Sequence, residues 1–130
     1  MTKPTILIID DCESVRETIA YVLENKYRIL HALNADQGLF LINLYQPDLI
    51  ITDHHMPGNY TGLDLVAILR RENNAIPVIM VSAFDLEHEV QSFSKTEYFP
   101  KPFDVKKFLK TVQTSLNKTE TNTRTPISTK

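Results

Sequence analysis

Five short apolar runs, separated by segments with helical spacing, constrain the fold of this chain more than any other feature. The runs lie at 5–9, 27–32, 49–52, 77–81 and 97–99. After the first run, Val15, Ile19 and Val22 recur at intervals of three or four residues, which predicts a helix over about 13–25. Strict alternation of strands with helices is typical of a parallel sheet that has helices on both faces. The chain is therefore predicted to be an α/β protein with a doubly wound sheet.

Capping residues and a proline mark the ends of further helices. Asn34 is expected to cap the second helix, with Gln37 three residues later in a capping-box arrangement, and Pro47 is expected to end it. Asp104 is expected to cap the last helix. The two remaining helices are expected over about 63–72 and 86–94. Together with the first helix, these segments predict five helices that alternate with the five strands.

The composition of the strands predicts their order in the sheet. Residues 6–9, 49–51 and 78–81 are apolar at every position, which suits central strands buried on both faces. The runs at 27–32 and 97–99 contain charged or polar residues, which suits the edges. The order 2-1-3-4-5 satisfies both conditions, and right-handed crossovers then reverse the winding between the first and third strands. Ligands of such sheets bind there, beyond the carboxyl ends of the strands.

Composition and charge narrow the class of protein. A chain of 130 residues and 14.9 kDa has the size of one domain, which we expect over 1–117, with 118–130 as a flexible threonine-rich tail or linker. Its 14 Lys and Arg nearly balance its 16 Asp and Glu, so no direct contact of this domain with nucleic acid is expected. Cys12 is the only cysteine, and no apolar run is long enough for a signal peptide or a membrane span. We therefore expect a cytoplasmic protein without membrane insertion.

Polar side chains follow four of the predicted strands. Asp10 and Asp11 follow the first, Asp53 the third, Ser82 the fourth and Lys101 the fifth. Three carboxylates at one edge of a sheet repel one another unless a cation joins them, and oxygen ligands of this kind suit Mg²⁺. A hydroxyl and an ammonium beside the metal would complete a pocket for a tetrahedral anion. The residues at this edge therefore predict a site for phosphoryl transfer.

Four short motifs occur in order between residue 5 and about residue 116. They are I-I-D-D at 8–11, D-x-x-M-P at 53–57, V-S-A at 81–83 and K-P-F at 101–103. With these motifs the chain resembles a response-regulator receiver domain of two-component signalling, of the chemotaxis-regulator-like kind. The resemblance implies a flavodoxin-like three-layer sandwich.

The resemblance also implies a phosphoacceptor and a metal site. Asp53 would accept a phosphoryl group from a phosphohistidine on a sensor histidine kinase or a phosphotransfer protein, forming an acyl phosphate. Asp10, Asp11 and Asp53 would hold Mg²⁺ together with the main-chain carbonyl of His55. The chain would then be a phosphorylatable signalling switch and no metabolic enzyme, with at most self-phosphorylation from small donors and self-dephosphorylation.

A route from the site to an output is implied in the same way. Ser82 and Lys101 would contact the phosphoryl oxygens, and a cis peptide between Lys101 and Pro102 would direct the ammonium into the site. Ser82 would move inward on phosphorylation, and the Tyr98 ring would fill the vacated space. The face made by the fourth helix, the fifth strand and the fifth helix would bind a downstream effector protein, a fused output domain or, in a phosphorylation-dependent homodimer, a second copy.

Two features of this chain stand out against the family pattern. His55 and Phe84 lie two positions after Asp53 and Ser82, where side chains of the family line the path of the attacking water. We therefore expect them to tune the lifetime of the phosphoryl group. The interval from Ser82 to Lys101 is also shorter than usual by roughly three to four residues, which affects the fourth helix. No glycine-containing corner precedes the last strand.

Other interpretations of the same residues remain open. A degenerate receiver would bind its partner without phosphorylation, and a buried ion network would have no chemistry at all. A Mg²⁺-dependent phosphohydrolase of small molecules would normally need a cap over its substrate, and no insertion here is long enough. A transition-metal site at His54, His55 and Cys12 is disfavoured, because neighbouring side chains at a strand end are expected to point to opposite faces. A single-domain protein and the receiver part of a longer chain are both compatible with the sequence.

Overall fold

Strands and helices alternate through the whole of the chain that the structure describes. The structure is a computed structural model in which the backbone is described for residues 3–128 and the side chains for residues 3–117. The elements are β1 (Thr5–Ile9), α1 (Glu13–Leu23), β2 (Arg28–Ala32), α2 (Ala35–Tyr45), β3 (Leu49–Asp53), α3 (Gly62–Arg71), β4 (Val78–Ser82), α4 (Glu87–Gln91), β5 (Thr96–Pro100) and α5 (Val105–Ser128). All strand pairs are parallel, and the order across the sheet is β2-β1-β3-β4-β5. The predicted fold class and strand order are confirmed.

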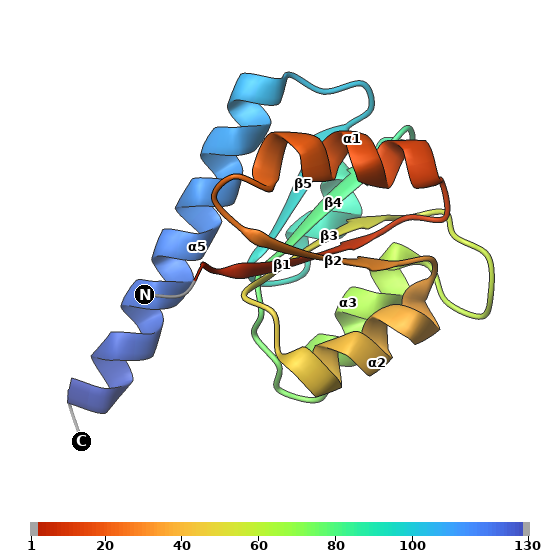
Figure 1. Ribbon diagram of the computed structural model, residues 1–130. Helices are drawn as coiled ribbons and strands as arrows, with labels where there is room; N and C mark the ends of the chain where they lie inside the picture. The colour runs from red at the N-terminus through yellow and green to blue at the C-terminus, as the bar shows by residue number, and fades with distance from the viewer. Residues whose placement is uncertain (1–2, 129–130) are drawn as a thin grey trace.

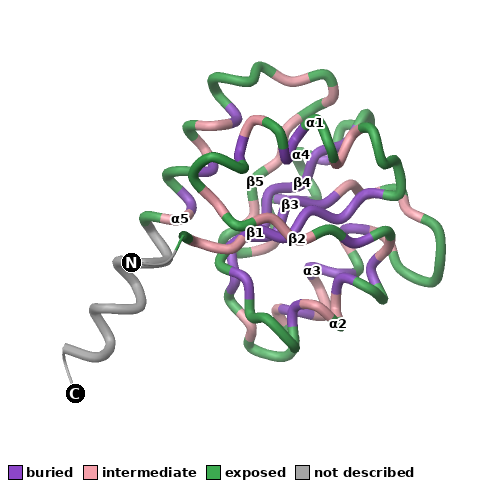
Figure 2. The backbone as a smooth tube through the Cα atoms, viewed as in Figure 1, coloured by how far each residue is buried: buried purple, intermediate pink, exposed green. Residues whose placement is uncertain are grey.

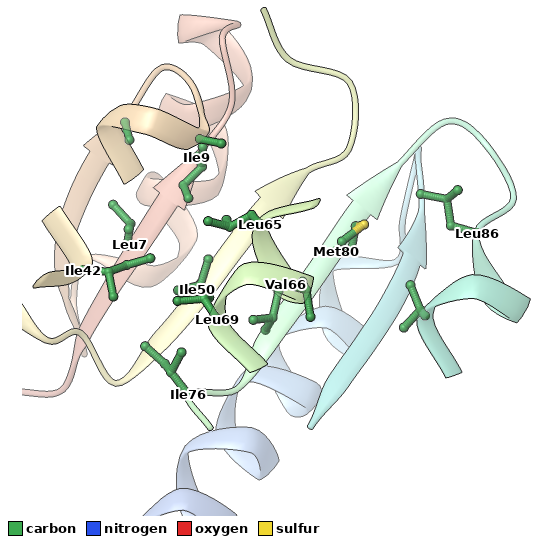
Figure 3. Close-up of a cluster of buried hydrophobic side chains, with 14 residues drawn as sticks. Leu7, Ile9, Ile42, Ile50, Leu65, Val66, Leu69, Ile76, Met80 and Leu86 are labelled. Atoms are coloured by element: carbon green, nitrogen blue, oxygen red, sulfur yellow. The ribbon is translucent and has the colours of Figure 1, made fainter. Parts of the chain in front are cut away.

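Each face of the sheet has its own hydrophobic core. Helices α1 and α5 cover one face, and α2 and α3 cover the other (Figure 1). Because the side chains of a strand alternate between its faces, Ile6 and Ile8 pack under α1 and α5, whereas Leu7 and Ile9 belong to the core on the α2 and α3 side (Figure 3). Strands β1, β3 and β4 are buried over most of their length (Figure 2), as their apolar composition predicts.

Both predicted helix caps are present, with one difference in geometry. The Asn34 side chain accepts a hydrogen bond from the Gln37 N–H at 2.8 Å, and the Asp104 side chain accepts one from the Lys106 N–H at 2.9 Å. The Gln37 side chain, however, accepts from the N–H of Leu33 at 2.6 Å and not from that of Asn34. The extended backbone at Asn34 (φ −156°, ψ 177°) presents the preceding N–H to Gln37, so the capping box is displaced by one residue.

The segment between β4 and β5 holds a very short helix. Helix α4 has 5 residues, whereas the sequence predicts a helix over about 86–94. After it, Lys95 adopts a left-handed backbone (φ 51°), which is uncommon for a residue with a Cβ. The Arg70 guanidinium donates hydrogen bonds to the carbonyls of Ser94 at 3.0 Å and Lys95 at 3.2 Å. Arg70 of α3 therefore stabilises the turn at Ser94 and Lys95, which replaces the predicted last residues of the helix before β5.

Helix α5 continues past the predicted end of the domain at residue 117. Its backbone is helical as far as Ser128, although the threonine-rich segment 118–130 is predicted to be a tail or linker. The side chains of this segment lie outside the described residues, so the domain boundary remains a prediction. No helix within residues 3–128 combines the length and the apolar character needed to cross a membrane.

Candidate functional site

The carboxyl ends of the parallel strands bring the predicted site residues to one edge of the sheet. Asp10 follows β1, Asp53 ends β3, Ser82 ends β4 and Lys101 follows β5. The N–H of Lys101 donates to the carbonyl of Ser82 at 2.8 Å, so the last two of these strand ends are joined directly. Asp10 and Ser82 are buried, Asp53 and Lys101 are partly exposed, and Asp11 is exposed. Residues that lie up to 91 positions apart in sequence thus form one cluster.

Three carboxylates in this cluster form a possible cation site. One oxygen from each of Asp10, Asp11 and Asp53 lies within 4.8 Å of the others. Within the described residues, no other group of three or more acidic, histidine or cysteine side chains comes together in this way. Three carboxylate oxygens form a hard, anionic ligand set, which fits Mg²⁺ or Ca²⁺ better than a softer transition metal. The donor set therefore suits the predicted Mg²⁺.

The Lys101 ammonium lies between two of the carboxylates. Its Nζ is 3.2 Å from Asp10 Oδ2 and 3.5 Å from Asp53 Oδ2. The peptide between Lys101 and Pro102 is cis, as the resemblance implies. The ammonium is thus placed to neutralise negative charge that gathers at Asp53.

Burial raises the pKa of Asp53 above its ordinary value. Lys101 and a hydrogen bond of 2.7 Å from the His54 N–H favour the charged form, but the nearby Asp10 carboxylate disfavours it. The burial effect is the largest of these, so ionised Asp53 is destabilised when no cation is bound. A cation bound at the three carboxylates would remove this penalty.

We expect Asp53→Asn to stabilise the metal-free protein at neutral pH. A raised pKa means that Asp53 destabilises the native state as the pH rises through that pKa, because a proton is lost from a carboxyl that the fold prefers neutral. In EDTA at pH 7, the melting temperature of the variant should therefore be higher than that of the wild type. The difference should disappear in acid, below the ordinary pKa of a carboxyl, where both side chains are neutral.

The control for this comparison is Asp36→Asn, which changes an exposed carboxylate in the first turn of α2. It should not raise the melting temperature, because an exposed carboxylate in the first turn of a helix is weakly stabilising. Thermal unfolding followed by circular dichroism at several pH values measures both variants. A lower melting temperature for Asp53→Asn at pH 7 would contradict the account of Asp53.

The loop after β4 connects the cluster to Tyr98 on β5. The buried Ser82 Oγ accepts a hydrogen bond from the Phe84 N–H at 3.1 Å. The Tyr98 hydroxyl donates to the main-chain carbonyl of Phe84 at 2.6 Å. The two residues predicted to act in the switch therefore bind the same residue of this loop.

Aromatic rings form a row beside the cluster. The rings of His55 and Phe84 meet edge to face with centroids 4.4 Å apart, and those of His54 and His55 do so at 4.7 Å. The expectation that His54 and His55 point to opposite faces is therefore wrong. Strand β3 ends at Asp53, so the alternation of a strand does not continue to these two residues. Neither histidine side chain belongs to the possible cation site within the described residues, and Cys12 precedes α1 as an exposed N-cap residue.

Two residues that the sequence analysis did not single out hold the site in shape. Arg16 Nη1 donates to the main-chain carbonyl of Asp10 at 2.7 Å and so supports the turn after β1. Gly62 begins α3 directly behind Asp53, because a Cβ at this position would lie 2.5 Å from the Asp53 carbonyl oxygen. A glycine at the start of a predicted helix is a usable signal for such a close approach, whereas Arg16 has no comparable signal in the sequence.

Comparisons with known proteins agree with this geometry. The sequence pattern of the response regulator receiver domain matches residues 6–113. The phosphate regulon transcriptional regulatory protein PhoB of Pseudomonas aeruginosa is 34% identical over 125 residues, which cover 92% of this chain and 54% of PhoB. The DNA-binding regulator RpaA of Synechocystis is 33% identical over 123 residues, covering 90% of this chain and 51% of RpaA. The chain thus spans about half the length of these two curated relatives, and 25% of the regulator NtrC of Proteus hauseri.

Solved structures give the same result. The receiver domain of the Francisella response regulator 1452 is similar with a TM-score of 0.81 and 30% identity, over 90% of this chain and 99% of that one. The chemotaxis protein CheY4 of Vibrio cholerae is similar with a TM-score of 0.78 and 25% identity, over 88% of this chain and 99% of that one. The sheet order, the acidic cluster and these matches lead to one conclusion: the chain belongs to the response-regulator receiver domains of two-component signal transduction.

Proposed function

We propose that this receiver takes a phosphoryl group onto Asp53 from a phosphohistidine of a sensor histidine kinase or a phosphotransfer protein. The observation that supports this most strongly is the position of the Asp53 carboxylate, which lies 3.5 Å from the Lys101 ammonium and beside Asp10 and Asp11. One matched relative is named Histidine kinase P4, and the match covers 8% of its length. A segment similar to this chain therefore occurs in a protein that is named as a histidine kinase.

In the transfer step, an Asp53 carboxylate oxygen forms a bond to phosphorus as the bond from phosphorus to the histidine nitrogen breaks. The histidine keeps the electron pair of that bond. Asp10, Asp11, Asp53 and the main-chain carbonyl of His55 would hold Mg²⁺, which would neutralise phosphoryl oxygens during the transfer. The Lys101 ammonium, which contacts both Asp10 and Asp53, and the Ser82 hydroxyl would bind the remaining oxygens.

The acyl phosphate is then the signal, and its loss ends the signal. His55 and Phe84 set its lifetime in this proposal, because their rings contact each other between the two loops that begin near Asp53 and Ser82. On phosphorylation, Ser82 would move inward and the Tyr98 ring would fill the space that it leaves. These movements would change the face made by α4, β5 and α5. That face would bind an effector protein, a fused output domain or a second copy of the chain. In this proposal the receiver domain itself ends at residue 117.

The experiment is to add acetyl phosphate and Mg²⁺ and to measure the intact mass over time. We expect a transient increase of one phosphoryl group that requires Mg²⁺. Asp53→Asn should show no adduct, and the exposed-site control Asp36→Asn should form it at the rate of the wild type. A folded wild type without an adduct would contradict the proposal and favour a degenerate receiver. Hydrolysis of an unrelated phosphate ester that Asp53→Asn abolishes would favour a phosphohydrolase instead.

A further inference from the structure

Phe84 connects three parts of the site through three different groups. Its N–H donates to Ser82 Oγ at 3.1 Å, and its carbonyl accepts from the Tyr98 hydroxyl at 2.6 Å. Its ring lies against His55, with centroids 4.4 Å apart. Phe84 therefore links the hydroxyl at the end of β4, the tyrosine on β5 and the loop after β3.

The Phe84 ring takes no part in the hydrophobic core. Its relative exposure is 58%, whereas Leu86 and Val90, which anchor α4 to the core, are 8% and 3% exposed. The position of the ring therefore depends on the backbone of Phe84 and on its contact with His55. The backbone is fixed on one side by Ser82 and on the other by Tyr98.

The ring pair bridges the two loops that flank Asp53. His55 lies two residues after Asp53 in the loop that follows β3, and Phe84 lies two residues after Ser82 in the loop that follows β4. Two aromatic rings in edge-to-face contact resist separation, and together they hold these loops near each other. Under the proposed function, these two loops border the path by which water reaches the phosphoryl group on Asp53.

We infer that Phe84 makes the lifetime of the phosphoryl group depend on the position of Tyr98. This inference rests on the proposed function of Asp53. While the Tyr98 hydroxyl binds the Phe84 carbonyl, the Phe84 ring stays against His55 and restricts the approach of water. When that hydrogen bond is absent, the Phe84 backbone is free to move, the ring pair separates more often and hydrolysis is faster. A partner that binds the Tyr98 face would thus also set how long the signal lasts.

The step concerned is hydrolysis of the acyl phosphate. A water oxygen forms a bond to phosphorus, and the bond from phosphorus to the Asp53 oxygen breaks. Asp53 leaves as a carboxylate with the electron pair, and the water protons stay with the product as dihydrogen phosphate. Phe84 is a positioning residue in this step, because it acts through the loops and contacts no reacting atom.

A double-mutant cycle on dephosphorylation tests the inference. The chain is phosphorylated with acetyl phosphate and Mg²⁺, the donor is removed, and the decay of the adduct is followed by intact mass. Tyr98→Phe, which removes only the hydroxyl, should speed the decay by about three-fold. Phe84→Ala should speed it at least as much, and adding Tyr98→Phe to Phe84→Ala should have no further effect, because the ring through which Tyr98 acts is gone.

Two matched controls make the same substitutions, Tyr→Phe and Phe→Ala, at exposed positions away from the site. Tyr21→Phe alters an exposed tyrosine on α1, and Phe40→Ala removes an exposed phenylalanine ring on α2. Both should leave the decay rate unchanged. The inference is overturned if Tyr98→Phe speeds the decay by the same factor with and without Phe84→Ala, or if it has no effect in the wild type. In either case the adduct still forms and the proposed function stands, whereas a wild type that never carries an adduct overturns both.

Discussion

Asp11→Asn is expected to slow the phosphorylation of Asp53 from acetyl phosphate by about 100-fold at limiting Mg²⁺. Asp11 is exposed and makes no hydrogen bond or ion pair with the described part of the chain, yet it contributes one oxygen to the possible cation site. Loss of its charge should therefore weaken metal binding and leave the fold intact. Raising the Mg²⁺ concentration should recover part of the rate, and EDTA should abolish phosphorylation of the wild type.

Asp11 separates metal binding from folding better than Asp10 does. Asp10 is buried, accepts a hydrogen bond from the Cys12 N–H at 2.9 Å and pairs with Lys101, so its replacement would disturb the turn as well. Asp36→Asn again serves as the exposed-carboxylate control and should not change the Mg²⁺ dependence. Phosphorylation rates of Asp11→Asn and wild type that coincide over the whole range of Mg²⁺ concentration would exclude Asp11 as a ligand.

Phe108→Ala is expected to lower the free energy of unfolding by about 3–5 kcal/mol. Phe108 on α5 is fully buried, and its ring contacts Phe103 and Phe99 with centroids 4.6 Å and 5.7 Å apart. Its removal leaves a cavity between α5 and the sheet and breaks two aromatic contacts. The change is measured by urea denaturation, with unfolding monitored by circular dichroism. A loss of this size is a large part of the total stability of a domain of this length.

The control for Phe108 is Val105→Ala at the start of the same helix. Val105 is 46% exposed, so its truncation should cost about 0.5 kcal/mol or less. Equal losses for the two variants would contradict the conclusion that burial of Phe108 against the sheet stabilises the fold. The difference between them therefore measures what burial of the Phe108 side chain contributes to stability.

The arrangement of the sheet was predictable because burial on both faces leaves a direct trace in composition. Strands β1, β3 and β4 have to be apolar on both faces, and the edge strands do not. Once the order is known, the carboxyl ends of the strands place Asp10, Asp53 and Lys101 together. Their proximity is thus a consequence of topology and needs no knowledge of side-chain packing.

Details that depend on packing between distant segments were not predictable. The left-handed backbone at Lys95 is supported by Arg70 from α3, and the carbonyl of Phe84 is bound by Tyr98 from β5. Local sequence patterns carry no information about such pairs. The capping box of Thr61 and Asp64 at the start of α3 is different, because its spacing is visible in the sequence and could have been used.

The most direct test of the central claim is to identify the residue that carries the phosphoryl group. Borohydride reduces an aspartyl phosphate to homoserine, which stays in the chain and is located by peptide mass spectrometry. After treatment with acetyl phosphate and Mg²⁺, we predict homoserine at position 53 and unmodified aspartate at positions 10 and 11. A phosphorylated protein with aspartate intact at position 53, or with the modification at another residue, would contradict the account.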